Sequence, residues 1–251
     1  MKKIDLNCDM GENIPGEKSN FDEEIMPFIS SCNIACGFHS GHPKLIERTI
    51  KLAIAHQVKI GAHPSYNDRE NFGRISLQID RDVLMAEIRY QICALKGMTE
   101  SFGAVLHHVK PHGALYNDMV EDRVLAEDFV KLVKEIDPNL KVYTLAHSQV
   151  MEVCAKLGII GVNEGFADRR YDELNKLRNR TLPGAVLHNL NEVLDQVELF
   201  LEQKVQLYSG KIEAVKIDSI CLHGDTRGAV ELSKNISQFL SEKNVEIAAV
   251  I

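Results

Sequence analysis

The chain has 251 residues, and 29 Lys and Arg against 36 Asp and Glu give it a formal net charge of −7. This length, with 45% hydrophobic residues, fits one large α/β domain or two small ones. No linker-like stretch divides the chain, so we expect a single domain over residues 1–251. The mildly acidic balance without a long basic block argues against nucleic acid or an anionic membrane as a partner.

The amino terminus reads MKKIDLNCDMGE and lacks the apolar core of a secretory signal. No apolar run approaches the ~20 residues that span a bilayer. The cysteines are scattered singly, and a chain of 251 residues does not need disulfides to stay folded. We therefore expect reduced thiols in a cytoplasmic protein.

Short apolar or β-branched runs alternate along the chain with segments of helical spacing. The runs span residues 4–8, 32–36, 58–62, 104–109, 141–145, 159–163, 217–222 and 245–251. Apolar helix faces fall within residues 46–54, 84–95, 125–136, 190–197 and 229–239. This alternation predicts right-handed crossovers and a parallel sheet. About eight such units favour a closed β/α barrel, with an open doubly wound sheet as the alternative.

Ionisable and polar residues gather where the predicted strands end. The carboxyl ends of parallel strands share one face, so these residues should converge in space. The set comprises Asn7, Asp9, Glu12, His39, His63, Lys110, His112, Glu164, Asp168, Arg169, His223 and Asp225. Long polar loops over residues 13–22, 63–74 and 168–185 follow predicted strands and should border the same site.

Other histidines are assigned differently. Three are expected at the surface, namely His56, His147 and His188. His107 and His108 are adjacent in a strand and must face opposite sides of it, so one of them can point into the barrel. His42 either reaches the site or lies at the start of the helix that Pro43 opens.

Asp9, His63 and His112 supply the oxygen and imidazole donors that Zn²⁺, Mn²⁺ or Fe²⁺ accept, and they leave positions for a water. A metal-free acid/base site fits the same residues.

Lys110, if desolvated, either loses basicity and acts as a general base or stays charged and pairs with an anion. The simplest alternative for Lys110 is an ion pair with Asp9 or Glu164. Neither GxxxxGK[ST] nor GxGxxG occurs, so no self-contained nucleotide site is visible.

Seven sequence blocks, in this order, resemble the LamB/YcsF family. The blocks are DLNCDMGE from Asp5, PFISSCNIACGFHSGHP from Pro27, IGAHPSYNDRENFGR from Ile60, HVKPHGALYN from His108, EGFADRRY from Glu164, LPGAVLHN from Leu182 and CLHGD from Cys221. The resemblance implies a seven-stranded β/α barrel of the glycoside hydrolase/deacetylase type. It also implies ATP-dependent opening of 5-oxo-L-proline to L-glutamate together with 5-oxoprolinase subunits B and C. His42 departs from the acidic residue expected after FHAG.

The implied reaction suggests roles for the clustered residues. ATP, with Mg²⁺, would be the co-substrate of the complex. Asp9 or Glu12 would act as general base on the attacking water, and Lys110 would hold a phosphate or the substrate carboxylate. His112 and Glu164 complete the expected catalytic set. The residues expected to bind substrate are Asn7, His39, His63, Arg169, His223 and Asp225.

Two alternatives remain open from sequence. The first is a metal-dependent deacetylase of a small N-acetyl substrate that uses Asp9, His63 and His112. Aromatic residues make up only 6% of the chain and tryptophan is absent, which argues against a long sugar-binding groove. The second is a non-catalytic subunit that binds 5-oxoproline.

Overall fold

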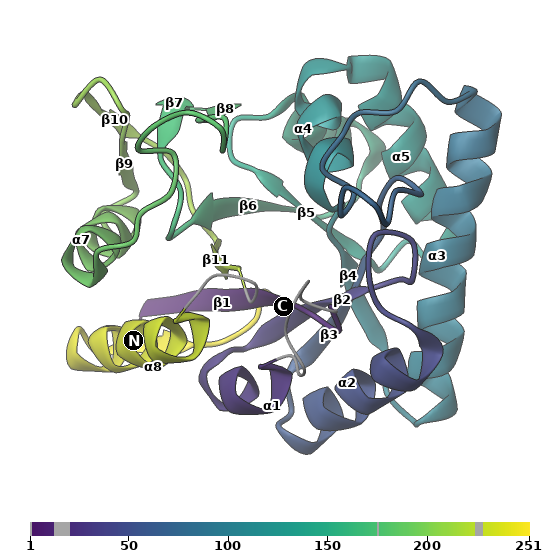
Figure 1. Ribbon diagram of the computed structural model, residues 1–251, viewed down its shortest axis with the longest axis horizontal. Helices are drawn as coiled ribbons and strands as arrows, with labels where there is room; N and C mark the ends of the chain where they lie inside the picture. Colours follow the sequence, from purple (N-terminus) through teal and green to yellow (C-terminus); the bar gives the residue numbers. More distant parts are fainter. Residues whose placement is uncertain (1, 13–20, 175, 224–227) are drawn as a thin grey trace.

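The computed structural model of the protein describes residues 2–12, 21–174, 176–223 and 228–251. Seven parallel strands form a closed barrel around the middle of the molecule (Figure 1). In barrel order they are β1 (Lys2–Met10), β2 (Ser31–Ala35), β3 (Lys59–His63), β4 (Leu106–Val109), β5 (Lys141–Leu145), β6 (Gly161–Phe166) and β11 (Ser219–Leu222). Because β11 pairs with β1, with Asn7 opposite Cys221, the open-sheet alternative is excluded.

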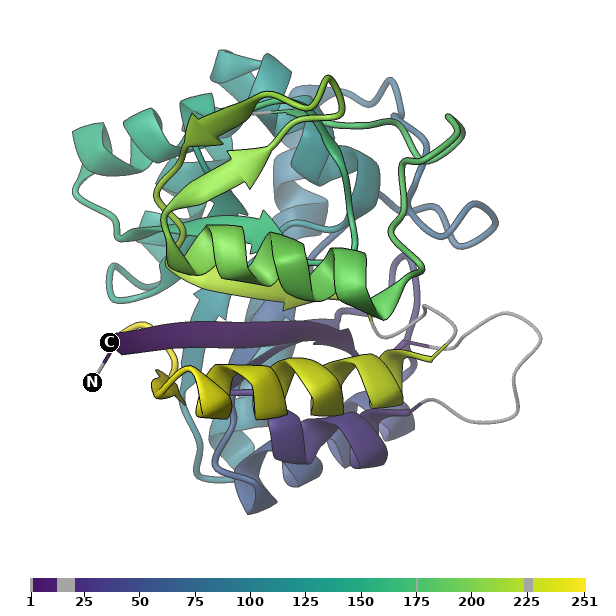
Figure 2. The same cartoon turned by 90° about the vertical axis from the view of Figure 1, so that its left-hand side faces the viewer.

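The eighth predicted strand exists but does not belong to the ring. β12 (Val245–Ile247) pairs in parallel with the first residues of β1, with Lys2 opposite Val245. The barrel therefore has the seven strands that the family resemblance implies. Figure 2 shows β1 crossing the molecule with α8 (Ala229–Glu242) alongside it and the carboxyl terminus near its start.

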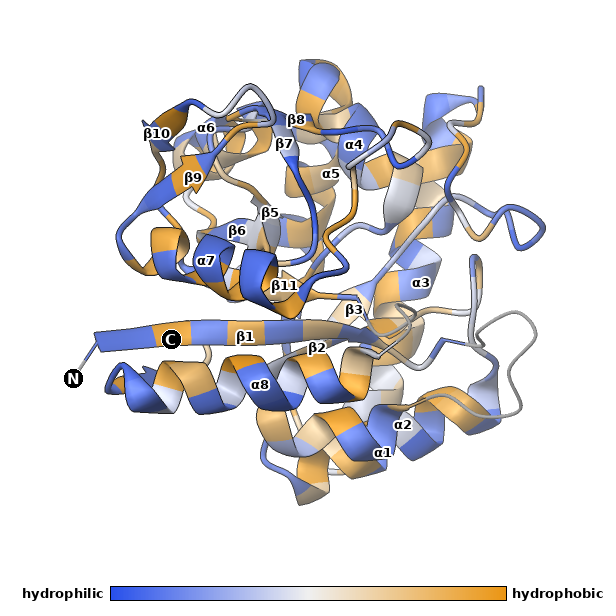
Figure 3. Ribbon diagram, turned by 60° about the vertical axis from the view of Figure 1, so that its left-hand side comes forward, coloured by the Kyte–Doolittle hydropathy of each residue, from blue (hydrophilic) through white to orange (hydrophobic). Residues whose placement is uncertain are grey.

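Helices cover the outside of the barrel, and the five predicted from apolar spacing are all present. Their bounds are α2 (Pro43–Ala55), α3 (Arg81–Ser101), α5 (Arg123–Ile136), α7 (Leu190–Leu201) and α8. Apolar and polar residues alternate along them in bands (Figure 3). Two residues of the predicted apolar faces differ from the prediction, because Ile54 of α2 is 37% exposed and Leu190 of α7 is 36% exposed.

Several short elements were not predicted from sequence. They are the helices α1 (Asp22–Ile25), η1 (Met26–Phe28), α4 (Gly113–Glu121) and α6 (Gln149–Leu157), and the antiparallel pairs β7 (Tyr171–Glu173) with β8 (Lys176–Leu177) and β9 (Lys204–Gln206) with β10 (Ile212–Ala214). None exceeds nine residues, which is too short for a clear apolar period. No helix in the described part of the chain combines the length and apolar character that crossing a membrane requires.

The barrel interior is polar at its centre. Successive residues of a strand point to opposite faces, and β1 alternates polar Asp5, Asn7 and Asp9 with apolar Leu6 and Cys8. All five are buried. The polar set hydrogen-bonds across the interior, whereas the apolar set belongs to the hydrophobic core that also includes the buried faces of the helices. This arrangement carries the polar network up to the carboxyl ends of the strands.

Candidate active site

Lys110 lies fully buried at the carboxyl end of the barrel, between two carboxylates. Its Nζ is 3.0 Å from Asp9 Oδ1 and 2.9 Å from Glu164 Oε1. It also lies 3.0 Å from Cys221 Sγ. Burial alone would lower the pKa of Lys110, but the two carboxylates and Cys221 hold that pKa well above its usual range. Lys110 is therefore an ammonium ion, and the predicted pairing with Asp9 or Glu164 involves both.

Asp9 is held from two sides. Its Oδ1 accepts hydrogen bonds from Lys110 and from Asn33 Nδ2, the latter at 2.8 Å. Its Oδ2 lies 3.3 Å from His63 Nε2. Burial would raise the pKa of the Asp9 carboxyl, yet attraction to His63 and Lys110 keeps it well below the usual range. Asp9 is ionised at neutral pH.

A second layer of polar side chains supports these groups from inside the barrel. Asn7 Nδ2 donates to Glu164 Oε1 at 3.0 Å and to Ser219 Oγ at 2.7 Å. Tyr116, one turn into α4, donates its hydroxyl to Glu164 Oε2 at 2.9 Å. His108 Nε2 lies 2.8 Å from Asn33 Oδ1. Each carboxylate oxygen of Glu164 is therefore engaged, which fixes its orientation towards Lys110.

Three imidazoles and one carboxylate gather beside Asp9. His39 Nε2 is 3.0 Å from Glu12 Oε1, and His112 Nδ1 is 2.9 Å from His63 Nε2. The rings of His39 and His112 stack with their centroids 3.8 Å apart. Candidate ligand atoms of Glu12, His39, His63 and His112 all lie within 4.8 Å of one another, and all four residues are buried. This donor set can hold a metal ion.

The cluster and Lys110 border a cavity of about 940 Å³. Asp9, Glu12, His63, Lys110, His112, Arg169 and His223 are the predicted site residues that line it. His39, Asn7 and Glu164 do not line the cavity but contact residues that do, through Glu12 and Lys110. Asp225 lies outside the described residues.

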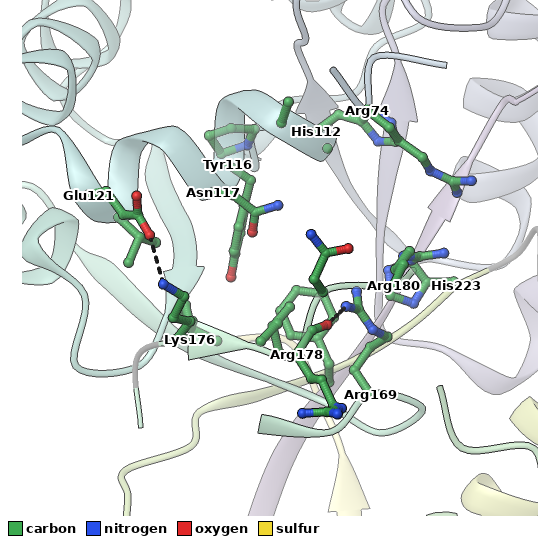
Figure 4. A pocket seen from close by; sticks show the side chains of 18 of the residues that line it. Arg74, His112, Tyr116, Asn117, Glu121, Arg169, Lys176, Arg178, Arg180 and His223 are labelled. Carbon is green, nitrogen blue, oxygen red and sulfur yellow. Dashed lines mark hydrogen bonds and ion pairs between the residues drawn. The ribbon is translucent and has the colours of Figure 1, made fainter. Parts of the chain in front are cut away.

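The far wall of the cavity comes from residues 168–185. Arg169, Arg178 and Arg180 lie near His223, while a dashed line joins Lys176 to Glu121 of α4 (Figure 4). These arginines give the wall positive charge, although Arg178 Nη1 pairs with Asp172 Oδ1 at 2.8 Å, and positive charge suits an anionic ligand. The sequence analysis selected Arg169 but not the other two, because neither follows a strand that the apolar pattern predicts.

His223 and Arg169 are each anchored in this wall. His223 Nδ1 lies 2.9 Å from both carboxylate oxygens of Asp168. Burial would raise the pKa of Asp168, but His223 lowers it below its usual range. Arg169 Nη2 donates to the carbonyl of Arg178 at 2.6 Å, and burial lowers the pKa of Arg169 to about 10.

The structure also locates the remaining histidines and the cysteines, including the histidines for which the sequence left two positions open. His42 caps α2 by accepting from the Leu45 amide at 3.4 Å, so it belongs to the helix start. His108 points into the barrel, and His107 Nε2 reaches the Val250 carbonyl at 2.8 Å instead. The three histidines expected at the surface are exposed. All six cysteines are free thiols.

The sequence matches the LamB/YcsF family over residues 4–251. It is 40% identical over 250 residues to the A subunit of 5-oxoprolinase from Haemophilus influenzae strain PittEE, covering 99% of this chain and 100% of that one. It is 42% identical over 245 residues to the A subunit of 5-oxoprolinase from Acinetobacter baumannii strain AB307-0294, covering 97% and 96%.

Solved structures show the same fold. A lactam utilization protein from Thermus thermophilus superposes with a TM-score of 0.91 at 36% identity, covering 99% of this chain and 100% of that one. A peptidoglycan deacetylase from Bacillus subtilis superposes at 0.51 with 10% identity, covering 99% and 88%, which is a likeness of fold alone. This chain is a member of the LamB/YcsF family.

Proposed function

We propose that this chain is the A subunit of a 5-oxoprolinase, which opens the lactam of 5-oxo-L-proline to L-glutamate with cleavage of ATP. Relatives named as that subunit, about 40% identical over the whole chain, support the proposal. The observation that carries it is the buried triplet of Asp9, Lys110 and Glu164 beneath a cavity with a cationic wall. The triplet offers acid/base groups, and the wall offers contacts for a small anionic substrate.

Opening the ring requires water to add to the lactam carbonyl carbon. The carbon–nitrogen bond then breaks, the nitrogen takes up a proton, and a new carboxylate forms. A lactam is resonance-stabilised, so the carbonyl needs activation. Transfer of a phosphoryl group from ATP to the lactam oxygen would supply it, because the lactam carbon then becomes more electrophilic. After water adds, the carbon–nitrogen bond breaks and leaves an acyl phosphate, and a second water hydrolyses that acyl phosphate to the carboxylate and inorganic phosphate.

In this reaction Asp9 acts as general base on the water. Lys110 and Asn33 occupy its Oδ1, and its Oδ2, which lies 3.3 Å from His63 Nε2, takes the proton. Lys110, held as an ammonium ion, pairs with the negatively charged phosphoryl group on the lactam oxygen. Glu12 and His112 line the same cavity and are the candidates for protonating the departing nitrogen. Glu164 keeps Lys110 in place.

Arg169, with its neighbours in the cationic wall, binds the substrate carboxylate or the phosphoryl group. His63 and His223 line the cavity beside these groups, and Asn7 and His39 support them from behind. Asp225 is part of the proposal on sequence grounds alone. The relatives are named as one lettered component of an enzyme, which supports assembly with further subunits, and we identify these as B and C.

ATP, with Mg²⁺, is the co-substrate of the complete complex in this proposal, and this sequence contains no GxxxxGK[ST] loop. A cytoplasmic location completes the proposal, since that compartment supplies ATP.

The test is an assay of glutamate release from 5-oxoproline with this chain alone, with B and C alone, and with all three. We expect ATP-dependent turnover only with all three. Robust ring opening by this chain without ATP would refute the dependence on partners. Full turnover by B and C alone would instead make this chain a non-catalytic binding subunit.

A second candidate is a metal-dependent deacetylase of a small N-acetyl substrate. The buried cluster of Glu12, His39, His63 and His112 favours it, because a metal ion there would activate water. Acetate release from a panel of small N-acetyl compounds, by this chain alone, would favour the deacetylase over the lactamase.

A further inference from the structure

The hydrogen atoms of two buried imidazoles can be placed from their partners. His63 Nδ1 lies 2.7 Å from the carbonyl oxygen of Lys110. His112 Nε2 lies 2.9 Å from the carbonyl oxygen of Phe72. A carbonyl oxygen only accepts hydrogen bonds, so each of these ring nitrogens carries the hydrogen.

The third imidazole is fixed through a serine. The Ser65 hydroxyl donates its single hydrogen to the carbonyl of Tyr66 at 2.9 Å. Ser65 Oγ must therefore accept from His39 Nδ1, 2.9 Å away. Ser65 is itself held by Gln91, whose amide bonds both the backbone N–H and the C=O of Ser65 at 2.9 Å.

The opposite ring nitrogens consequently carry lone pairs: those of His63 and His112 face each other, and that of His39 faces Glu12. His63 Nε2 and His112 Nδ1 stand 2.9 Å apart, and His39 Nε2 stands 3.0 Å from Glu12 Oε1. Lone pairs facing each other at these distances repel unless a proton or a metal ion lies between them.

We propose that Glu12, His39, His63 and His112 bind one divalent first-row transition ion of the Zn²⁺ class. Metal-binding histidines usually donate their other ring N–H to a carbonyl or other oxygen, as all three do here. Four ligands about 2.0–2.1 Å from a tetrahedral ion lie about 3.3 Å apart. The contacts His63–His112, His39–Glu12 and His112–Glu12 measure 2.9, 3.0 and 3.7 Å, and the other pairs of ligand atoms lie within 4.8 Å.

This ligand set differs from the one predicted from sequence. It keeps His63 and His112 but replaces Asp9 with Glu12 and His39. Asp9 Oδ1 is engaged by Lys110 and Asn33, and its Oδ2 lies beside the ligand His63. Asp9 is thus placed next to the metal as the base, in agreement with its role in the proposed reaction. The competing explanation is a protonated His63 paired with Asp9 and no metal.

Metal content of the full-length purified chain provides the first test. After removal of metal by chelation, we expect Zn²⁺ to rebind with one equivalent per chain by elemental analysis and by competition with a chromophoric chelator. His39→Asn and His112→Asn should each abolish stoichiometric binding. His56→Asn, at the surface, should bind as the wild type does.

The supporting shell provides a second test that leaves the ligands intact. Ser65→Ala removes the acceptor that fixes His39, and we expect metal affinity to fall about 10–100-fold. Ser65→Thr should restore it by returning the hydroxyl. Ser148→Ala is the matched control, because it removes a buried hydroxyl that bonds Thr144 instead.

A folded wild-type chain that binds no stoichiometric Zn²⁺, Mn²⁺, Fe²⁺ or Co²⁺ would overturn the proposal and favour the protonated His63. Binding unchanged by His39→Asn and His112→Asn would overturn the ligand set. If either ligand variant fails to fold, the wild-type stoichiometry and the Ser65 variants decide. Every readout is metal binding, so failure here is distinguishable from failure of the proposed lactam hydrolysis.

Discussion

Asp9 is the side chain to which the proposed chemistry is most sensitive, because it contacts Lys110, Asn33 and His63 at once. Asp9→Asn keeps the size of the side chain but removes its charge and basicity. Loss of a general base lowers a rate by about 10²–10⁴. We expect that loss in ATP-dependent glutamate formation by the complete complex, with the variant folded and assembled. A fully active Asp9→Asn complex would remove Asp9 from the mechanism.

Lys110 should matter for stability as well as for catalysis. Lys110→Met leaves Asp9 and Glu164 buried without the cation between them, and breaking a buried ion pair from one side costs about 3–5 kcal/mol. We expect that decrease in the free energy of unfolding measured by urea denaturation. Lys141→Met is the control. Burial lowers the pKa of Lys141, so the folded state disfavours its charge, and removing that charge should not decrease the free energy of unfolding in the same way. Equal losses from the two variants would contradict the argument.

His107 gives the protein a stability that depends on pH. Burial lowers the pKa of His107 to about 4, against about 6.5 in an unfolded chain. The unfolded state therefore binds more protons below pH 6.5. The contribution of His107 is fully present above that pH and is lost as the pH falls towards 4. The slope is at most about 1.4 kcal/mol per pH unit for one group.

Replacement of His107 by glutamine, His107→Gln, should flatten the fall in melting temperature between pH 6.5 and 4.5. His56→Gln, at an exposed position, should leave that fall unchanged. A wild-type melting temperature that does not decrease over this range would show that the folded protein accepts the proton without cost.

At this scale the sequence could identify residues that end strands but not those that support them. His63, Lys110 and His112 follow apolar runs, so their convergence could be expected. Asn33 and Tyr116 support the site from a strand interior and a helix, where neither residue type is unusual. One sequence pattern could have indicated polar side chains inside the barrel: polar residues alternate with apolar ones along these buried strands. Buried parallel strands normally consist of continuous apolar runs.

At the scale of elements, all eight predicted strands exist in the predicted order, but β7–β10 were not predicted, and two strands extend further towards the site than their apolar runs. β1 runs to Met10 and β6 to Phe166, so Asp9 and Glu164 belong to strands and do not follow them. Polar side chains interrupt the apolar pattern near the ends of β1 and β6, although the backbone hydrogen bonds to neighbouring strands continue. Inside a barrel such side chains find partners across the interior, which an apolar count along one strand does not detect.

The loop between β3 and α3 packs directly onto the histidine cluster through a glycine. Gly73 has φ of +63°, and a Cβ there would stand 2.9 Å from His39 Cβ and 3.0 Å from His112 Cδ2. Gly73→Ala should therefore displace both rings as well as strain the backbone. We expect at least a tenfold loss of metal affinity and of complex activity.

Gly103→Ala is the matched control for the loop. Gly103 has φ of +77° with nothing within 4 Å of the added Cβ. Gly103→Ala therefore strains the backbone as Gly73→Ala does, but its new methyl group clashes with no neighbouring atom. The control should lose about 1 kcal/mol of stability and keep its metal affinity. Equal effects of the two variants on metal affinity would assign the Gly73 effect to strain alone.

The whole molecule is closed by contacts between the two ends of the chain. β1 pairs with β2, with β11 and, at its first residues, with β12. The polar network binds the strands a second time, because Asp5 accepts from Ser31 and Ser219 at 2.5–2.9 Å. Burial raises the pKa of Asp5, and those hydroxyls oppose the rise. The first strand thus cannot leave the barrel without opening three interfaces and exposing this network.

We therefore expect the chain to unfold as one cooperative domain over residues 1–251. Differential scanning calorimetry of the isolated chain should show a single transition whose calorimetric and van't Hoff enthalpies agree.

Ser219→Ala removes hydrogen bonds to Asp5 and Asn7 across the seam between β1 and β11 that closes the barrel. It should lower the melting temperature by several degrees while keeping one transition, because each buried bond is worth about 1 kcal/mol. Two resolved transitions in the wild type would contradict a single domain, and an unchanged melting temperature would show that the seam does not depend on this serine.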